Sequence, residues 1–324
     1  MPADDLAGRL FAGERAAVSD ALNLVDDARP EQQTAARELL DRLEARGDTA
    51  RRLGVTGAPG SGKSTLIDAV LRELRSRDQS VGIIAVDPSS RSSGGALLGD
   101  RLRMRSGATD PGVFVRSMAA RDRLGGLADA TRAGVQILSA VFDWVFVETV
   151  GVGQSESEVA YLVDTLCFVA QPAAGDTLQF MKAGILELPD LFVVNKADLG
   201  ASALRTANEL QAGLGMGTSR EDDWTPPVLL TSARDGEGIR ELVDQMEAHR
   251  QHLDARDSLG ERRLRGRVAY VLESLQRAYG AHGIDRAGGR DALEQRIGSS
   301  ESATSVLLAT LGQEIEAQIR EPTP

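Results

Sequence analysis

The stretch "GAPGSGKST", residues 57–65, decides the fold that this sequence predicts. It matches the phosphate-binding pattern G-x-x-x-x-G-K-[ST], with the apolar run "LGVT" before it and the helical pattern "STLIDAVLREL" after it. Its glycines allow the backbone to curl around phosphate oxygens, and the positive end of the following helix adds to the attraction. Lys63 is expected to reach the β- and γ-phosphates and to act in catalysis, and the Ser64 hydroxyl to bind Mg²⁺. The loop residues expected to bind nucleotide are Gly57, Ala58, Pro59, Gly60, Ser61, Gly62, Lys63, Ser64 and Thr65.

Short apolar runs alternate with helical patterns from residue 53 onward. The runs are "RLGVTG", "SVGIIAVD", "GVFVRSM", "WVFVETV", "TLCFVAQ", "LFVVNKAD" and "PPVLLTSA". Most are continuous rather than alternating, as expected for strands covered by helices on both faces. The regular alternation predicts an α/β fold of the P-loop NTPase type, with a doubly wound, mostly parallel sheet. Ligands bind such sheets at the carboxyl ends of the strands, where the motifs below lie.

Helical patterns flank this region on both sides. Residues 3–52 carry apolar residues at helical spacing among acids and arginines, and similar patterns occupy 237–253, 261–280 and 301–320. We therefore predict three parts: an N-terminal helical extension, 1–52; a P-loop GTPase domain, 53–255; and a C-terminal helical arm, 256–324. Such arms often dimerise.

The tetrapeptide "NKAD", residues 195–198, ends one of the predicted strands. A carboxylate at Asp198 can accept hydrogen bonds from the ring N1–H and the exocyclic amine of guanine. Adenine has no such pair of donors, so Asp198 is expected to select GTP over ATP. Asn195 is expected to brace the loops, and the Lys196 stem to pack over the base.

A second base-binding segment, "TSARDGEGI", residues 231–239, follows the last predicted strand. Its Ser232, Ala233 and Arg234 resemble a loop whose backbone amide contacts the guanine O6. The segment is weak evidence alone, but its place after the other two motifs supports a guanine nucleotide site.

The stretch "ETVGVGQSE", residues 148–156, follows the apolar run "DWVFV" and has the character of a nucleotide switch. Gly151 is placed to contact a γ-phosphate through its backbone N–H. In Ras-like enzymes the water-orienting glutamine directly follows this glycine. Here Val152 holds that position and Gln154 lies two residues further on, which predicts slow intrinsic hydrolysis that a partner could accelerate.

The expected Mg²⁺ ligands combine the loop serine with three acids. Glu148 stands at the end of its strand, where it would bind the ion directly or through water. Asp87 and Asp100 belong to the polar segment "VDPSSRSSGGALLGDRLRM", residues 86–104, which resembles a mobile first switch. With Ser64 they form the predicted metal set, and Glu148, Gly151 and Gln154 join Lys63 as candidate catalytic residues.

Composition limits the remaining possibilities. The 324 residues carry a net charge of −11, which argues against broad binding to nucleic acid. No apolar stretch approaches the ~20 residues of a membrane-spanning helix, and we expect a soluble cytoplasmic protein. The single cysteine, Cys167, lies in an apolar run and is expected in the core. His249 and His252, three apart on a predicted helix, are interpreted as solvent-facing.

In this order the motifs resemble the methylmalonyl-CoA mutase-associated GTPases of the MeaB/ArgK type, a family once described as transport kinases. The resemblance covers roughly residues 35–255. It implies the signal-recognition and metal-insertion class of GTPases, slow GTP hydrolysis and a homodimer joined by the C-terminal arm. It also implies a partner, an adenosylcobalamin-dependent acyl-CoA mutase, which the GTPase protects and whose cofactor loading it gates.

Two alternatives stay open at this point. A nickel-insertion GTPase would share the fold but would hold its metal with clustered Cys and His, and this chain has one Cys and three His. A P-loop kinase linked to amino-acid transport would transfer phosphate to an acceptor and would rarely need guanine readout.

Overall fold

The computed structural model describes residues 3–27, 29–87, 110–119, 126–149, 159–172, 187–215 and 223–320. The chain divides into two compact units, each formed by separated segments. The larger unit comprises Thr49–Ala120 and Phe142–Leu259; the smaller comprises Met1–Asp48, Arg121–Val141 and Gly260–Pro324.

The larger unit contains a seven-stranded sheet in the order β3-β2-β4-β1-β5-β6-β7. All pairings between these strands are parallel. The strands are β1 (Arg51–Thr56), β2 (Val81–Asp87), β3 (Val113–Ala119), β4 (Trp144–Glu148), β5 (Thr165–Ala170), β6 (Leu191–Val194) and β7 (Val228–Leu230). Each of the seven apolar runs forms one strand, so the predicted parallel α/β sheet is confirmed.

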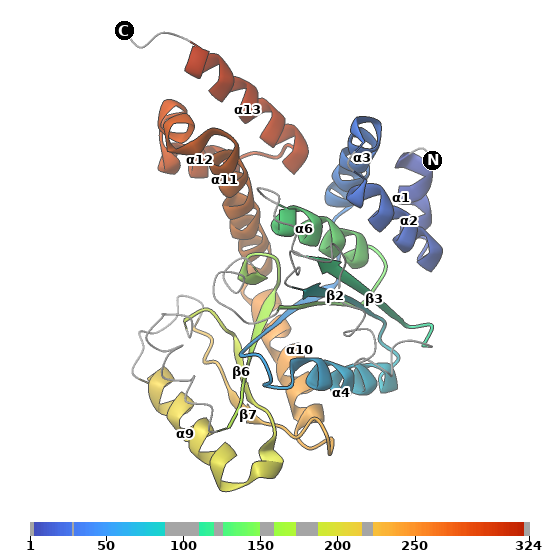
Figure 1. Ribbon diagram of the computed structural model, residues 1–324, viewed down its shortest axis with the longest axis vertical. Coiled ribbons are helices and arrows are strands. Elements are labelled where there is room, and N and C mark those ends of the chain that lie inside the picture. The colour runs from blue at the N-terminus through green and yellow to red at the C-terminus, as the bar shows by residue number, and fades with distance from the viewer. Residues whose placement is uncertain are drawn as a thin grey trace, which may run out of the picture. The chain divides into compact units, whose positions relative to one another are not determined.

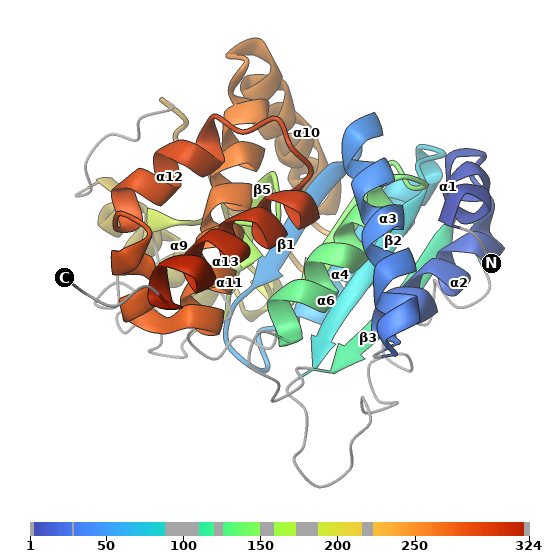
Figure 2. The ribbon, with the colours of Figure 1, turned by 90° about the horizontal axis from the view of Figure 1, so that it is seen from above.

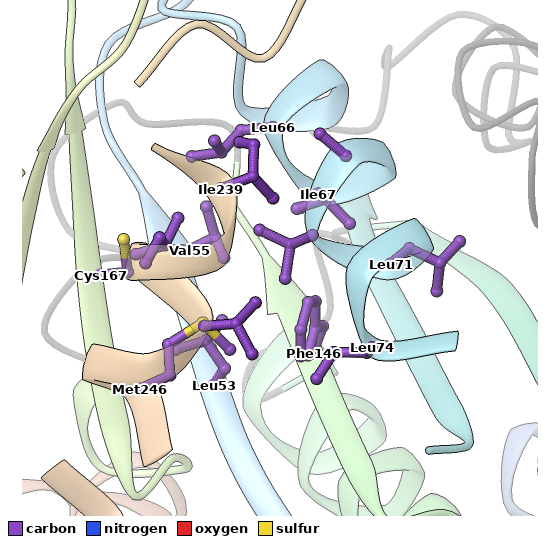
Figure 3. Close-up of a cluster of buried hydrophobic side chains, with 14 of the residues drawn as sticks. Leu53, Val55, Leu66, Ile67, Leu71, Leu74, Phe146, Cys167, Ile239 and Met246 are labelled. Atoms are coloured by element: carbon purple, nitrogen blue, oxygen red, sulfur yellow. The ribbon is translucent and has the colours of Figure 1, made fainter. Parts of the chain in front are cut away.

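Helices cover the sheet on both faces (Figure 1). On one face α4 (Lys63–Ser76) and α10 (Ile239–Ala255) pack against the strands. Leu66 and Leu71 of α4 and Ile239 and Met246 of α10 belong to one buried apolar cluster, part of which is drawn in Figure 3. On the other face α9 (Ala201–Gly215) packs against β5 and β6. Successive side chains of a strand point to opposite faces of the sheet, and helices cover both faces. The residues on either face are therefore buried, which explains why the runs are continuously apolar.

The position of β1 determines what meets at the carboxyl edge of the sheet. β1 lies between β4 and β5, with Val55 paired to Glu148 on one side and to Cys167 on the other. The loop after β1 therefore begins beside the ends of both neighbouring strands. These are the places where parallel sheets bind ligands.

The smaller unit is helical. Helices α1, α2 and α3 pack on one another, as Figure 2 shows, and α2 and α3 also contact α6. A separate apolar cluster joins α11, α12 and α13 around Leu275, Leu293 and Leu311. The bounds are α1 (Ala3–Phe11), α2 (Arg15–Asp26), α3 (Pro30–Arg46), α6 (Gly126–Ser139), α11 (Ser258–Arg286), α12 (Arg290–Gly298) and α13 (Thr304–Arg320). Among the described helices of both units, none has the length and apolar character needed to cross a bilayer.

The interpretation of His249 as solvent-facing is wrong. Its side chain is 0% exposed, with Nδ1 2.8 Å from the Thr165 hydroxyl and Nε2 3.5 Å from a carboxylate oxygen of Asp190. The ring of Trp224 packs edge-on against it. The reason is helical phase: His249 follows Leu242 and Met246 on the face of α10 that packs on the sheet. That spacing could have identified it from the sequence.

Cys167 is buried in the core, and this leads to a testable result. Burial, with a smaller contribution from the nearby Asp190 carboxylate, raises the pKa of the thiol from 9.0 to about 12. The thiolate is the form that reacts with disulfide reagents. At pH 8 we therefore expect Cys167 in the native protein to react about a thousandfold more slowly than in the urea-unfolded chain. Absorbance at 412 nm with Ellman's reagent measures both rates; equal rates would contradict the burial.

Because of the same pKa shift, the contribution of the Cys167 thiol to the free energy of unfolding depends on pH. The folded state favours the protonated thiol, so its stabilising contribution is complete below pH 9.0, the ordinary pKa, and is lost as the pH rises towards about 12.

Candidate functional site

The loop between β1 and α4 turns through three glycines with positive φ. The φ values are 139° for Gly57, 82° for Gly60 and 91° for Gly62. Residues other than glycine rarely adopt such positive backbone angles. α4 begins at Lys63 directly after the last of them. The first-turn N–H groups of a helix have no acceptor within the helix, so this end is suited to an anion. Of the other loop residues, Ala58 and Ser61 are buried, and Pro59 and Thr65 are exposed.

Lys63 lies folded over this loop. Its Nζ donates hydrogen bonds to the carbonyl oxygens of Gly57, at 2.8 Å, and Ala58, at 3.1 Å. The residue is only 7% exposed. The ammonium group is thereby held against the loop that the sequence assigns to phosphate binding.

Gly57 leaves no room for a side chain. A Cβ there would lie 2.1 Å from the backbone oxygen of Val169 in β5. Since backbone cannot move aside cheaply, we expect Gly57→Ala to lower the free energy of unfolding by about 2–4 kcal/mol. Urea unfolding followed by circular dichroism measures the difference.

Gly60→Ala is the matched control for that variant. Gly60 also has a positive φ, but among the described residues a Cβ there would contact only the side-chain oxygen of Gln171, at 3.6 Å. Gly60→Ala therefore introduces the backbone strain without the clash. Its free energy of unfolding should fall by less than that of Gly57→Ala. Equal losses would show that the contact with Val169 does not matter.

Asn195 joins two of the predicted loops. Its Nδ2 donates to the Ser61 carbonyl at 3.0 Å, and its Oδ1 accepts from the Ala233 N–H at 3.2 Å. The residue is 2% exposed. Both ends of its amide are therefore used, which ties the phosphate loop to the segment after β7.

Lys196 makes a second, direct connection to the same loop, and it also contacts Gln171, a residue that was not singled out from the sequence. Its Nζ donates to the Gly60 carbonyl at 2.8 Å and to Gln171 Oε1 at 3.1 Å. Gln171 follows β5 directly. A polar residue at the carboxyl end of a buried strand is the signal that could have identified it.

Asp198 faces the segment after β7. Its carboxylate lies 3.2 Å from the Ser232 hydroxyl and 3.4 Å from the Arg234 guanidinium, and its side chain is 24% exposed. Arg234 also binds the adjacent Asp235, and this hydrogen bond, more than any other cause, lowers the pKa of the Asp235 carboxyl. The predicted base-binding residues thus lie together at one end of the site.

Glu148 and Ser64 meet at the other end. The Ser64 hydroxyl donates to Glu148 Oε1 at 2.7 Å, although the residues are 84 positions apart. Glu148 is 7% exposed and lies at the end of β4. Asp87 ends β2, while Asp100, Gly151 and Gln154 lie outside the described residues. Within the part of the chain that the structure describes, no cluster of three or more His, Cys, Asp or Glu side chains is placed to hold a metal ion.

Comparison with known families places this geometry in context. Residues 18–279 match the model of the family described as "Methylmalonyl Co-A mutase-associated GTPase MeaB". A protein named "GTPase ArgK" from Escherichia coli (strain K12) is 40% identical over 240 residues, which cover 72% of each chain. The "methylmalonic aciduria type A homolog, mitochondrial" of Mus musculus is 36% identical over 286 residues, covering 84% of this chain and 69% of the mouse protein.

A solved structure gives the same picture of the fold. The crystal structure of a protein described as "LAO/AO transport system kinase" matches with a TM-score of 0.72 and 28% identity, over 97% of both chains. The similarity therefore extends across the helical parts at both ends as well as the sheet.

Proposed function

The chain belongs to the MeaB family of methylmalonyl-CoA mutase-associated GTPases and is a GTP hydrolase, and from that premise we propose that its hydrolysis serves an adenosylcobalamin-dependent acyl-CoA mutase. The GTPase protects this mutase and gates the loading of its cofactor. The observation that carries the proposal is the family match over residues 18–279, supported by the similarity to the mouse methylmalonic aciduria homologue.

In this proposal, residues at the two ends of the site bind the two ends of the nucleotide, its phosphates and its base. The ammonium group of Lys63 leaves its carbonyl partners to neutralise the β- and γ-phosphates, where negative charge accumulates during transfer. Asp198 binds the guanine edge, and Asn195 keeps the two loops in a fixed relation. Gly151 contacts the γ-phosphate through its backbone, as the sequence predicts.

The residues fit Mg²⁺ as the accompanying ion. This ion prefers hard oxygen ligands in octahedral geometry at about 2.1 Å, so neighbouring ligand oxygens lie about 3 Å apart. The Ser64 hydroxyl and the Glu148 carboxylate, 2.7 Å apart, are suited to two such neighbouring positions, with phosphate and water supplying others. Asp87 and Asp100 complete the proposed metal set. When bound, the ion would offset negative charge on the phosphates.

Intrinsic hydrolysis is proposed to be slow. Val152 directly follows Gly151, where Ras-like enzymes have the glutamine that orients water, and Gln154 lies further along the chain. A partner that completes the site would then accelerate the reaction. We further propose that the protein is a cytoplasmic homodimer joined by its C-terminal arm.

Steady-state release of phosphate from GTP tests this proposal, with the purified protein alone and with methylmalonyl-CoA mutase from the same source. ATP serves as the nucleotide control, and size-exclusion chromatography reports complex formation and dimerisation. We expect slow, GTP-selective release of phosphate without any added acceptor, and a rise of at least tenfold when the mutase is present.

The outcomes separate the parts of the proposal. Formation of GDP that requires lysine, arginine or ornithine, with the γ-phosphoryl group transferred to that acceptor and no free phosphate released, would replace hydrolysis with kinase chemistry. If GTP turnover is unchanged by the mutase and no complex forms, the mutase assignment falls. Isobutyryl- and ethylmalonyl-CoA mutases, assayed in the same way, then determine whether another acyl-CoA mutase is the partner.

A further inference from the structure

Two protein groups already contact the carboxylate that is proposed to read the base. Asp198 Oδ1 lies 3.2 Å from the Ser232 hydroxyl, and Asp198 Oδ2 lies 3.4 Å from Arg234 Nη2. Guanine offers this carboxylate two parallel N–H donors, from its ring N1 and its exocyclic amine. A guanidinium group offers a similar planar fork of N–H donors. Arg234 and guanine therefore compete for the same acceptor.

Arg234 has a second partner that can retain it. Its Nε lies 3.0 Å from Asp235 Oδ1 and its Nη2 lies 3.1 Å from Asp235 Oδ2. The same Nη2 thus stands between two carboxylates, closer to that of Asp235. If guanine took Asp198, the guanidinium would keep its two-point contact with Asp235 and would not lose all of its pairing.

Ser232 is shared in the same way. Its hydroxyl is 2.7 Å from Asp235 Oδ2 and 3.2 Å from Asp198 Oδ1, and a hydroxyl has one proton to donate. Donation to Asp235 leaves Asp198 free of that bond. Asp235 can therefore hold both groups that otherwise occupy the guanine-reading carboxylate.

We propose that Arg234 is a competing residue that weakens the binding of guanine nucleotides and speeds their release. The inference rests on the assignment of Asp198 as the guanine reader and does not depend on the mutase. Arg234 is 72% exposed, so its pairing with Asp198 is screened by water. Exposed pairs of this kind change an equilibrium by a factor of about two to five. GDP and GTP should be affected equally, because both present the same base.

The test compares wild type with Arg234→Met, which keeps an unbranched apolar stem and removes the guanidinium donors. A fluorescent GDP analogue measures Kd and the dissociation rate, and competition with unlabelled GDP, GTP and ADP measures selectivity. Arg240→Met is the matched control, since Arg240 is also exposed, at 82%, and pairs with Glu73 in α4. It removes the same charge from the same unit without touching Asp198.

We expect Arg234→Met to bind GDP and GTP two- to fivefold more tightly and to release GDP correspondingly more slowly, with ADP unaffected. The difference from wild type should vanish in 1 M salt, where the screening length is about 3 Å. Arg240→Met should behave like wild type.

Unchanged or weaker GDP binding in Arg234→Met would overturn the inference, as would tightening shared by ADP. Asp198→Asn, measured in parallel, separates this failure from a wrong base assignment. If Asp198→Asn leaves GDP binding intact, Asp198 does not read guanine. If it weakens binding while Arg234→Met has no effect, only the competition is disproved.

Discussion

Lys63→Met is expected to lower kcat for GTP hydrolysis about 10²- to 10³-fold while the protein stays folded. The Lys63 side chain is buried against the phosphate loop, and its ammonium group donates hydrogen bonds to two carbonyl oxygens of that loop. Methionine keeps the buried stem and removes the charge. The loss resembles removal of one preorganised donor to a transition-state oxygen, which typically reduces kcat by this factor.

Single-turnover hydrolysis with enzyme in excess measures the effect, and thermal unfolding checks that the fold is retained. Arg72→Met provides the control, because Arg72 lies on the same helix, 59% exposed, and pairs only loosely with Asp68 at 3.5 Å. It should keep nearly full activity. A Lys63→Met protein with more than half of the wild-type kcat would remove Lys63 from the catalytic mechanism.

Asp198→Asn is expected to weaken GTP binding about 10²- to 10³-fold and to transfer the preference to xanthosine triphosphate. The hydrogen bond from the guanine amine is lost and the one from N1–H now goes to a neutral acceptor, whereas each bond to the charged carboxylate contributes about 1.5–3 kcal/mol. Xanthine has a carbonyl where guanine has its amine. The asparagine amide can donate to that carbonyl and accept from N1–H, so the variant should bind xanthosine triphosphate more tightly than GTP.

Equilibrium binding of both nucleotides to both proteins measures the exchange of preference. Asp244→Asn makes the same charge change at an exposed position, 55% accessible and paired with Arg77, and should leave both affinities unchanged. If Asp198→Asn lost affinity for both nucleotides equally, the residue would support the loop and would not read the base.

The sequence predicted the sheet well because its signal is local. Each buried strand needs a short, continuous apolar run, and the seven runs from "RLGVTG" to "PPVLLTSA" all became strands. The phosphate loop was equally clear, since its glycines, lysine and serine are adjacent in the chain. The interpretation of His249 as solvent-facing was wrong because it rested on the lack of further soft metal ligands near it, whereas the apolar pattern through Met246 places it on the face of α10 that packs on the sheet.

The parallel α/β architecture and the phosphate loop could therefore be predicted from local patterns in the sequence, and the same patterns led to the proposal that Asp198 reads the base. Which distant groups meet around these residues depends on the three-dimensional fold. The pairing of β1 with β4 brings Glu148 to Ser64, and the pairing of β5 with β6 brings Gln171 to Lys196. The bond from Asn195 to Ser61 crosses 134 residues. Such contacts depend on strand order and helix phase through the whole unit, and no local pattern of residues contains them.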